Sequence, residues 1–241
     1  MTAEGAGKEP SDRLEGLREL AHLGERGSRA ALAGFVFAAL FVVGWLLLAQ
    51  SPELDAPADE LMSYYTTPSE RRSSFLAGFY VIPFAGIAFI WYMAALRARI
   101  HRAGGLEHRL FSTVQLMSGT LFVAAVFLIA VTELAAARLG ESMQSSGDVD
   151  GVRNVLALGS AASQIFALRT GAVFIGVSAN RASRAGLFPG WFSVISLVLA
   201  VALLFVATSW QPVVLIIPIW VMVTSFVVLT YRRNQPSPVE A

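Results

Sequence analysis

Six long apolar stretches, separated by polar segments, dominate the hydrophobic pattern of this chain. A helix needs roughly 20 predominantly apolar residues to cross the hydrocarbon core of a bilayer. The pattern therefore predicts an all-α fold, a polytopic membrane bundle of six transmembrane helices in which a tight hairpin joins the last two. The predicted spans cover residues 30–49, 75–96, 111–137, 154–179, 187–207 and 212–231.

The composition supports a membrane protein. The chain has 241 residues, of which 55% are hydrophobic and only 15% charged, and its mean hydropathy is +0.60. A soluble domain is about one quarter charged, so this chain could not cover its own surface in water. The net charge of +1 gives no support for nucleic-acid binding. The absence of cysteine excludes disulfides, thiol nucleophiles and thiolate metal sites.

Arginine and lysine alternate between the two sides of the predicted bundle. Because positive residues stay in the cytoplasm, the distribution places both termini there. Thirteen such residues lie on the side of the termini: Lys8, Arg13, Arg18, Arg26, Arg29, Arg97, Arg99, Arg102, Arg109, Arg181, Arg184, Arg232 and Arg233. Four lie on the other side, namely Arg71, Arg72, Arg138 and Arg153.

Three regions follow from this pattern. Residues 1–29 form a cytoplasmic N-terminal segment, in which leucines at three-residue spacing predict a short amphipathic helix. Residues 30–231 form the six-helix transmembrane domain, and residues 232–241 form a disordered cytoplasmic tail. In the first outer loop, residues 57–65 predict one or two turns of interfacial helix carrying Tyr64 and Tyr65.

Residues for catalysis or for metal binding are not evident. His22, His101 and His108 all lie outside the predicted spans, so none is placed to ligate haem or another metal within the bilayer. Known hydrolase, metalloprotease and phosphate-binding motifs are missing. We therefore predict no catalytic residue, no metal site and no cofactor, and an enzyme is the weakest hypothesis.

Arg169 is the sharpest functional signal, because it lies near the middle of the fourth span. A mid-bilayer arginine costs about 2.5–3.5 kcal/mol on insertion scales, so it should face protein or water. Glu133 is the one acidic residue well inside a predicted span. At 1.5 Å per residue it lies roughly 13 Å outward from the midpoint of its span, whereas Arg169 lies about 4–5 Å from the midpoint of its own span toward the cytoplasm. A direct pair between the two is therefore disfavoured. We therefore treat Glu133 as an outer charged site that meets Arg138, Arg153 or water.

An arginine without a carboxylate partner supports two hypotheses. In the first, the protein binds or passes a small anion or anionic amphiphile, such as a lipid, at a polar cavity. In the second, it is a non-transporting scaffold or accessory subunit, and Arg169 bonds carbonyls and locks helices together. The candidate ligand-binding residues are Arg169, Gln164, Ser160, Ser163, Thr170, Ser118 and Thr120. On a helical wheel, Ser160, Ser163 and Gln164 share one face and Arg169 lies on the opposite face.

Prolines and small residues add two structural expectations. Pro83 and Pro218 predict helix kinks at similar depth. Two hypotheses follow: the kinks are absorbed by packing, or they open an outward vestibule beside the polar face of the fourth span. Ala30, Gly34 and Ala38 recur every four residues. Small residues at this spacing permit close helix contact, either within the chain or in a homo-oligomer.

The segments "SYYTTPSERRSSFLAGFY", "FIWYMAALRARI" and "LFPGWFSVISLVLA" resemble six-helix bacterial integral membrane proteins, especially actinobacterial ones, classed as domains of unknown function. The resemblance covers most of residues 30–231. It implies a single six-helix domain in the bacterial plasma (inner) membrane, and it carries over no activity and no functional residue.

Overall fold

The structure is a computed structural model that describes residues 31–52, 54–103, 109–146, 149–206 and 211–231. Every regular element within these ranges is helical, which confirms the predicted all-α membrane bundle. The predicted N-terminal amphipathic helix, Ala30 and the C-terminal tail lie outside the described residues.

The chain forms a series of long helices with short irregular segments inserted in three of them. The first helix is Ala31–Leu48. The short helix α2, Ala58–Thr66, confirms that a helix forms where one was predicted at 57–65, and its interfacial position stays a prediction. The other elements are α3 (Arg72–Leu76), the π-helix η1 (Ala77–Val81), α4 (Ile82–Arg102), α5 (Arg109–Ser146), α6 (Val149–Ala161), the π-helix η2 (Ala162–Ala167), α7 (Leu168–Arg184), α8 (Gly190–Phe205), the 3₁₀-helix η3 (Gln211–Leu215) and α9 (Ile216–Tyr231).

Five helices are long and apolar enough to cross a membrane: Ala31–Leu48, Arg72–Arg102, Arg109–Glu141, Val149–Arg184 and Pro212–Thr230. The predicted count of six is therefore not exact. The span predicted at 187–207 is the 16-residue helix α8, which extends only about 24 Å at 1.5 Å per residue. It is short because Pro189 before it and Val206 after it both have extended backbone conformations.

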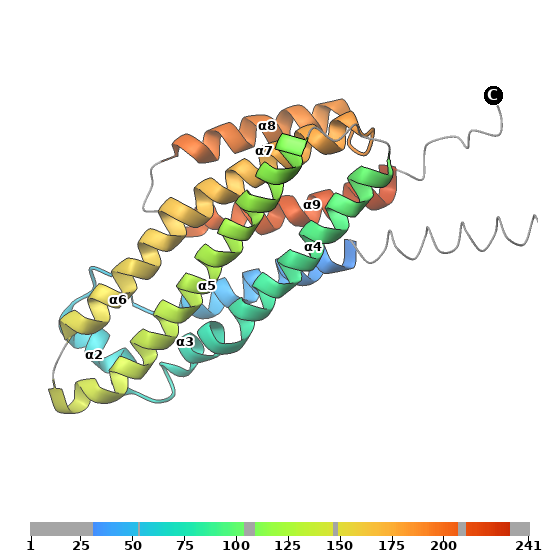
Figure 1. Cartoon of the computed structure of the whole chain (residues 1–241). Coiled ribbons are helices and arrows are strands. Elements are labelled where there is room, and N and C mark those ends of the chain that lie inside the picture. The colour runs from blue at the N-terminus through green and yellow to red at the C-terminus, as the bar shows by residue number, and fades with distance from the viewer. Residues whose placement is uncertain (1–30, 53, 104–108, 147–148, 207–210, 232–241) are drawn as a thin grey trace, which may run out of the picture.

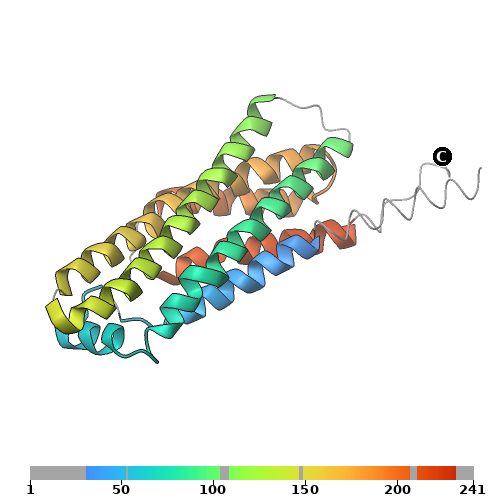
Figure 2. The same ribbon diagram turned by 60° about the horizontal axis from the view of Figure 1, so that its bottom comes forward.

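The helices pack lengthwise in one bundle, and α5 contacts α2, α3, α4, α6 and α7 (Figures 1 and 2). The end of the bundle that carries α2 and the junction of α5 with α6 is called the α2 end. The opposite end, where α4, α7 and α9 finish, is called the basic end (Figure 1). It carries the described arginines Arg97, Arg99, Arg102, Arg109, Arg181 and Arg184.

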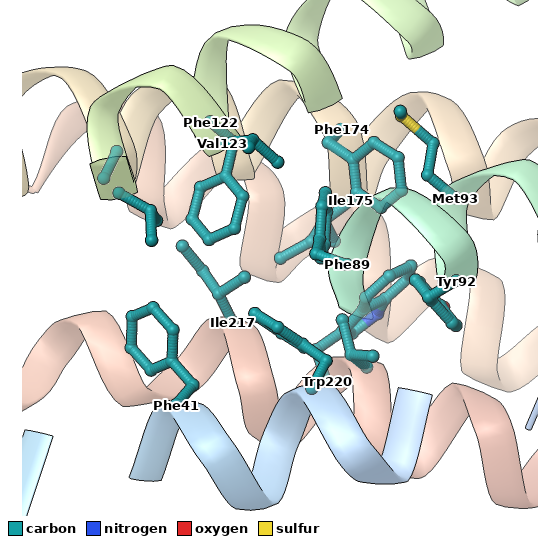
Figure 3. Close-up of a cluster of buried hydrophobic side chains, with 14 of the residues drawn as sticks. Phe41, Phe89, Tyr92, Met93, Phe122, Val123, Phe174, Ile175, Ile217 and Trp220 are labelled. Atoms are coloured by element: carbon teal, nitrogen blue, oxygen red, sulfur yellow. The ribbon is translucent and has the colours of Figure 1, made fainter. Parts of the chain in front are cut away.

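A group of aromatic rings fills the middle of the bundle (Figure 3). The ring of Phe89 lies 4.9 Å from Phe37, 4.8 Å from Phe122 and 5.0 Å from Phe174, measured between centroids. All four side chains are fully buried. Such tilted and edge-to-face pairs are favourable beyond the area that they bury, so four helices are fixed to one another at this level.

Buried hydroxyl and indole groups connect further helices. Tyr92 of α4 donates to the Thr224 hydroxyl of α9 at 2.6 Å, because Thr224 uses its own hydrogen on the Val221 carbonyl. The Trp220 indole donates to Ser196 of α8 at 2.9 Å. Trp220 is only 4% exposed. It is therefore a core residue of the bundle and does not belong to an interfacial aromatic belt.

The small residues of the first helix are used within the chain. Gly34 and Ala38 are both buried, and a Cβ atom added at Gly34 would lie 2.0 Å from the Ser225 Oγ of α9 and 3.0 Å from the Tyr92 ring. Glycine therefore allows the first helix to approach α4 and α9 closely. A homo-oligomer through the Ala30, Gly34 and Ala38 face stays a prediction.

Candidate functional site

A cavity of about 110 Å³ lies toward the α2 end of the bundle. Its wall is mostly apolar, with polar groups from α5, α6 and η2. The volume is sufficient for several water molecules or a small ligand, since one water needs about 10–15 Å³ on this measure. The lining residues are Phe41, Trp45, Leu48, Ser51, Pro52, Leu54, Ile82, Val126, Ile129, Glu133, Leu156, Gly159, Ser160, Ser163, Gln164 and Val214.

Three helices depart from regular α-geometry beside this cavity. The π-helix η2 contributes Ser163 and Gln164, η3 contributes Val214, and Ile82 directly follows the π-helix η1. A π-turn holds one residue more than an α-turn, and π-turns occur frequently at functional sites. The local irregularity therefore changes which side chains face the cavity.

The two predicted kink prolines account for two of these irregular segments. Pro83 is the second residue after η1, and Pro218 is the third residue after η3. A proline lacks the N–H that would bond the carbonyl four residues earlier and sterically opposes that carbonyl. The affected residues are Phe79, within η1, and Val214, within η3. The cavity lies between these segments and the polar residues of the fourth span, in the position of the expected vestibule.

Among the residues that the structure describes, Glu133 of α5 contributes the one acidic side chain of the cavity lining. Its Oε2 atom is buried and has no hydrogen-bond partner within the described part of the chain. Burying a carboxylate oxygen without a partner is costly. Glu133 Oε2 therefore lacks a donor, and a bound ligand or an ordered water would supply one.

The arginines expected to meet Glu133 are engaged elsewhere. Arg153 donates to the Ala56 carbonyl at 2.8 Å, and the Arg138 guanidinium lies 5.5 Å from the centroid of the Phe75 ring. The ion pair found among the described residues joins Arg71 to Glu141 at 3.3 Å. Within the described residues Glu133 forms no ion pair with Arg138 or Arg153, and its expected contact with outer water stays a prediction.

Tyr65 of α2 lies close enough to Glu133 to interact with it electrostatically. Burial raises the pKa of the Tyr65 phenol, and the neighbouring Glu133 and Tyr64 raise it further. The Tyr65 hydroxyl is also buried without a hydrogen-bond partner among the described residues. Tyr65 is thus a neutral phenol next to the carboxylate end of the cavity.

Arg169 is half-buried and lies outside the lining of the cavity. Its Nη1 atom donates to the backbone carbonyl of Gln164 at 2.7 Å and approaches that of Ile165 at 3.4 Å. Both acceptors belong to η2, one turn before Arg169 in the same helix. The Nη1 hydrogens therefore find neutral acceptors, and these bonds do not neutralise the charge itself.

The remaining predicted site residues divide into two groups. Ser160, Ser163 and Gln164 line the cavity, and the Gln164 amide donates to the Ser160 hydroxyl at 3.2 Å. Thr170 donates back to the Phe166 carbonyl at 2.7 Å. The three other members, Thr170, Ser118 and Thr120, do not line the cavity. The buried Ser118 donates to the Gln115 carbonyl, and Thr120 is exposed.

Glu133 was predicted to form an outer charged site, separate from the ligand-binding site with Ser160 and Ser163. The depths of these residues in their spans nevertheless indicate that they lie close together. At 1.5 Å per residue, Ser160 lies roughly 9 Å and Glu133 roughly 13 Å toward the same side of the midpoint of its span. Ser51 and the apolar wall carry no comparable signal, because their position depends on how the first helix and its following turn pack.

The described residues contain no group of three His, Cys, Asp or Glu side chains that could hold a metal ion. Comparison with protein-family models, with curated proteins and with solved structures finds no match to this chain. The resemblance to six-helix bacterial membrane proteins stays a prediction that these comparisons do not test.

Proposed function

We propose that this integral membrane protein binds a small cationic molecule with an apolar body in the Glu133 cavity. The observation that carries the proposal is the Glu133 carboxylate, which lines the cavity and has a buried oxygen without a donor. Ser160, Ser163 and Gln164 supply further hydrogen-bonding groups, and the aromatic and aliphatic wall suits an apolar body.

A cation fits the cavity better than an anion does. A carboxylate attracts an ammonium group and repels an anion, and no arginine lines the cavity. The anion expected from the sequence stays a proposal for Arg169, whose guanidinium lies apart from this lining. The two proposals therefore concern different groups and are separable by substitution.

Binding is favoured over free passage because the aromatic core fills the bundle beyond the cavity. Phe41 belongs both to the cavity wall and to the buried core. Phe37, Phe89 and Phe122 lie deeper and are 0% exposed. Passage to the basic end would require these rings to move, so we propose a binding site reached from the α2 end.

The proposed location is the bacterial plasma membrane, with both termini in the cytoplasm. The distribution of charge supports this orientation. The basic end carries six described arginines. The acidic residues whose side chains are described all lie in the half of the bundle that contains the α2 end, and they are Asp55, Asp59, Glu60, Glu70, Glu133, Glu141 and Asp150. Positive residues mark the cytoplasmic side, so the cavity would open toward the periplasmic side.

The test compares three probes that share one aromatic ring: benzylammonium, benzyl alcohol and benzoate. The purified protein is placed in lipid nanodiscs, and binding is measured by equilibrium dialysis against empty nanodiscs. We expect the wild type to prefer benzylammonium, and Glu133→Gln to weaken that binding roughly tenfold or more, because a hydrogen bond to a charged group is lost. Glu141→Gln is the matched control, since Glu141 lies on the same helix but is 52% exposed and paired with Arg71.

Two results would contradict cation binding. One is equal weakening by Glu133→Gln and Glu141→Gln, which would indicate a general effect of surface charge. The other is a preference for benzoate that Arg169→Gln abolishes, which would instead support the anion proposal.

A scaffold or accessory subunit is the second candidate function, and the Arg169–Gln164 bond favours it. Because Arg169 bonds carbonyls of its own helix, its first effect is to hold η2 in shape. This function predicts that Arg169→Gln lowers the thermal unfolding midpoint, that none of the three ring probes binds, and that a protein partner co-purifies with the wild type.

A further inference from the structure

A second, larger hollow lies at the basic end, between α4 and α5. It has a volume of about 470 Å³ and is lined by Ile90, Met93, Arg97, His101, Gln115 and Leu116, together with two alanines of α4. It is called the Arg97 groove. It shares no lining residue with the Glu133 cavity, so a ligand of the groove is independent of a cation bound in that cavity.

The groove changes from apolar to basic along the axis of α4. Ile90 and Arg97 are separated by two helical turns, and His101 follows Arg97 by one more turn, so the lining extends roughly 16 Å from Ile90 to His101. Ile90 is 43% and Leu116 of α5 41% exposed, which leaves this face open to lipid. An apolar stretch that leads to a basic group has the same order as an acyl chain followed by a phosphate.

Arg97 provides an available positive charge at the basic end of the groove. It is half-buried, and within the described ranges its guanidinium has neither a hydrogen bond nor an ion pair. A guanidinium offers five donors in a planar arrangement that matches phosphate oxygens. The His101 side chain is exposed at the next turn of the same face.

Gln115 connects the groove to a second guanidinium. Its amide donates to Ser178 at 2.8 Å, and its side-chain carbonyl accepts a hydrogen bond from the buried Arg181 of α7. Gln115 is a neutral acceptor, so this bond positions the Arg181 charge near the groove without cancelling it. Acidic residues do not occur in the described parts of α4, of the first three turns of α5, or of α7. Within these described segments the charged side chains are all basic, which favours an anion.

We propose that the Arg97 groove binds one anionic phospholipid, with its phosphate at Arg97 and His101 and an acyl chain over Ile90 and Leu116. Basic pockets between transmembrane helices are suited to anionic headgroups. A zwitterionic lipid presents the same acyl chains but carries no net charge to match the arginines. The groove should therefore discriminate between lipids by headgroup charge.

The experiment uses nanodiscs that contain equal amounts of dioleoyl phosphatidylglycerol and dioleoyl phosphatidylcholine. The protein is released into mild detergent, and native mass spectrometry measures the ratio of the two lipids that it retains. We expect the wild type to retain phosphatidylglycerol preferentially and Arg97→Gln to reduce that preference roughly fivefold. Arg184→Gln is the matched control, because the exposed Arg184 lies at the same end but outside the groove.

A second variant keeps all charges and fills the apolar part of the groove. Leu116→Trp should displace the acyl chain and lower the retention of phosphatidylglycerol, and the partial exposure of Leu116 makes the larger side chain compatible with folding. The proposal is overturned if the wild type retains both lipids equally, if Arg184→Gln reduces the preference as much as Arg97→Gln, or if Leu116→Trp has no effect. Displacement of the lipid by millimolar inorganic phosphate would also overturn it, since the site would then be a free-anion site.

Discussion

The two charged residues that lie deepest in the predicted spans find different kinds of partners. Arg169 bonds backbone carbonyls of η2, whereas Glu133 keeps a buried oxygen without a donor beside a cavity. A guanidinium needs acceptors, and helix carbonyls supply them locally. A carboxylate needs donors, which the carbonyl side of a helix does not supply. This asymmetry explains why Arg169 Nη1 finds acceptors on its own helix and Glu133 Oε2 finds no donor within the described residues.

At the same scale, substitution of Gly34 should disturb the packing of the first helix against α9. Gly34→Ala should destabilise the protein by about 1–3 kcal/mol through overpacking, because the new Cβ would lie 2.0 Å from Ser225 Oγ. Thermal unfolding in detergent measures the change. Gly190→Ala is the control with the opposite expectation, since no atom lies within 4 Å of its added Cβ and alanine is the better helix former.

A double-mutant cycle makes the cause specific. Removing the Ser225 hydroxyl with Ser225→Ala should recover part of the loss in Gly34→Ala. Additive effects of the two substitutions would show that the close contact between the first helix and α9 does not cause the destabilisation.

At the scale of the elements, the π-helix η2 determines which side chains of the fourth span face the cavity. A turn with bonds from residue i to i+5 contains one residue more than a regular turn. The regular helices α6 and α7 on either side are thereby rotated relative to a single continuous α-helix. The side chains of Leu158, Ile165 and Phe166 remain exposed, so this span has a lipid-facing side in addition to its packed one.

Deletion of Ile165 tests this role of η2. Ile165 is 49% exposed and lies within the π-helix, so the deletion should leave a regular α-helix with little change in thermal stability. Benzylammonium binding should fall roughly tenfold or more, because Ser163 and Gln164 leave the cavity wall and a charged ligand loses their hydrogen bonds. Equilibrium dialysis and thermal unfolding provide the two measurements.

Deletion of Leu158 is the matched control for this experiment. Leu158 is similarly exposed, at 54%, but lies in the regular helix α6, where no extra residue is present. Its deletion should rotate the helix by about 100° and destabilise the bundle. Equal destabilisation by both deletions would contradict the interpretation of η2 as a one-residue insertion.

At the scale of the whole molecule, the two ends of the bundle differ in charge. The α2 end carries the Glu133 cavity and the basic end carries the Arg97 groove, with the aromatic core between them. This polarity is the physical basis for an orientation in the membrane, since insertion keeps positive segments on the cytoplasmic side.

Single cysteines can test the orientation directly, because the chain contains none of its own. Ser69→Cys at the α2 end and Ala103→Cys at the basic end both replace exposed residues. A membrane-impermeant maleimide applied to intact bacterial cells should label Ser69→Cys, and it should label Ala103→Cys only after permeabilisation. The reverse pattern would place the termini outside the cytoplasm and the cavity inside it.

The all-α class, the positions of the long helices and the separation of charge between the two ends could all be predicted from the sequence. These features depend on local composition, because apolar runs of membrane length and basic flanks act largely independently of which helices become neighbours. The helical wheel of the fourth span also placed Arg169 on the face opposite Ser160, Ser163 and Gln164. Grouping the four in one ligand site was a further step, and the structure does not bring Arg169 into that lining.

The partners of the buried polar groups depend on how the helices pack and could not be predicted from the sequence. The presence of Glu133 and Ser160 in one cavity lining depends on how α5 is rotated against α6, and the close packing at Gly34 depends on the approach of α9. The carbonyls bonded by Arg169 belong to a π-turn, which a constant 100° periodicity cannot represent. The length of α8 depends on where its backbone leaves the helix. Each of these features is fixed by packing between segments distant in the chain or by a departure from ideal helix geometry, and neither is visible in local hydrophobicity.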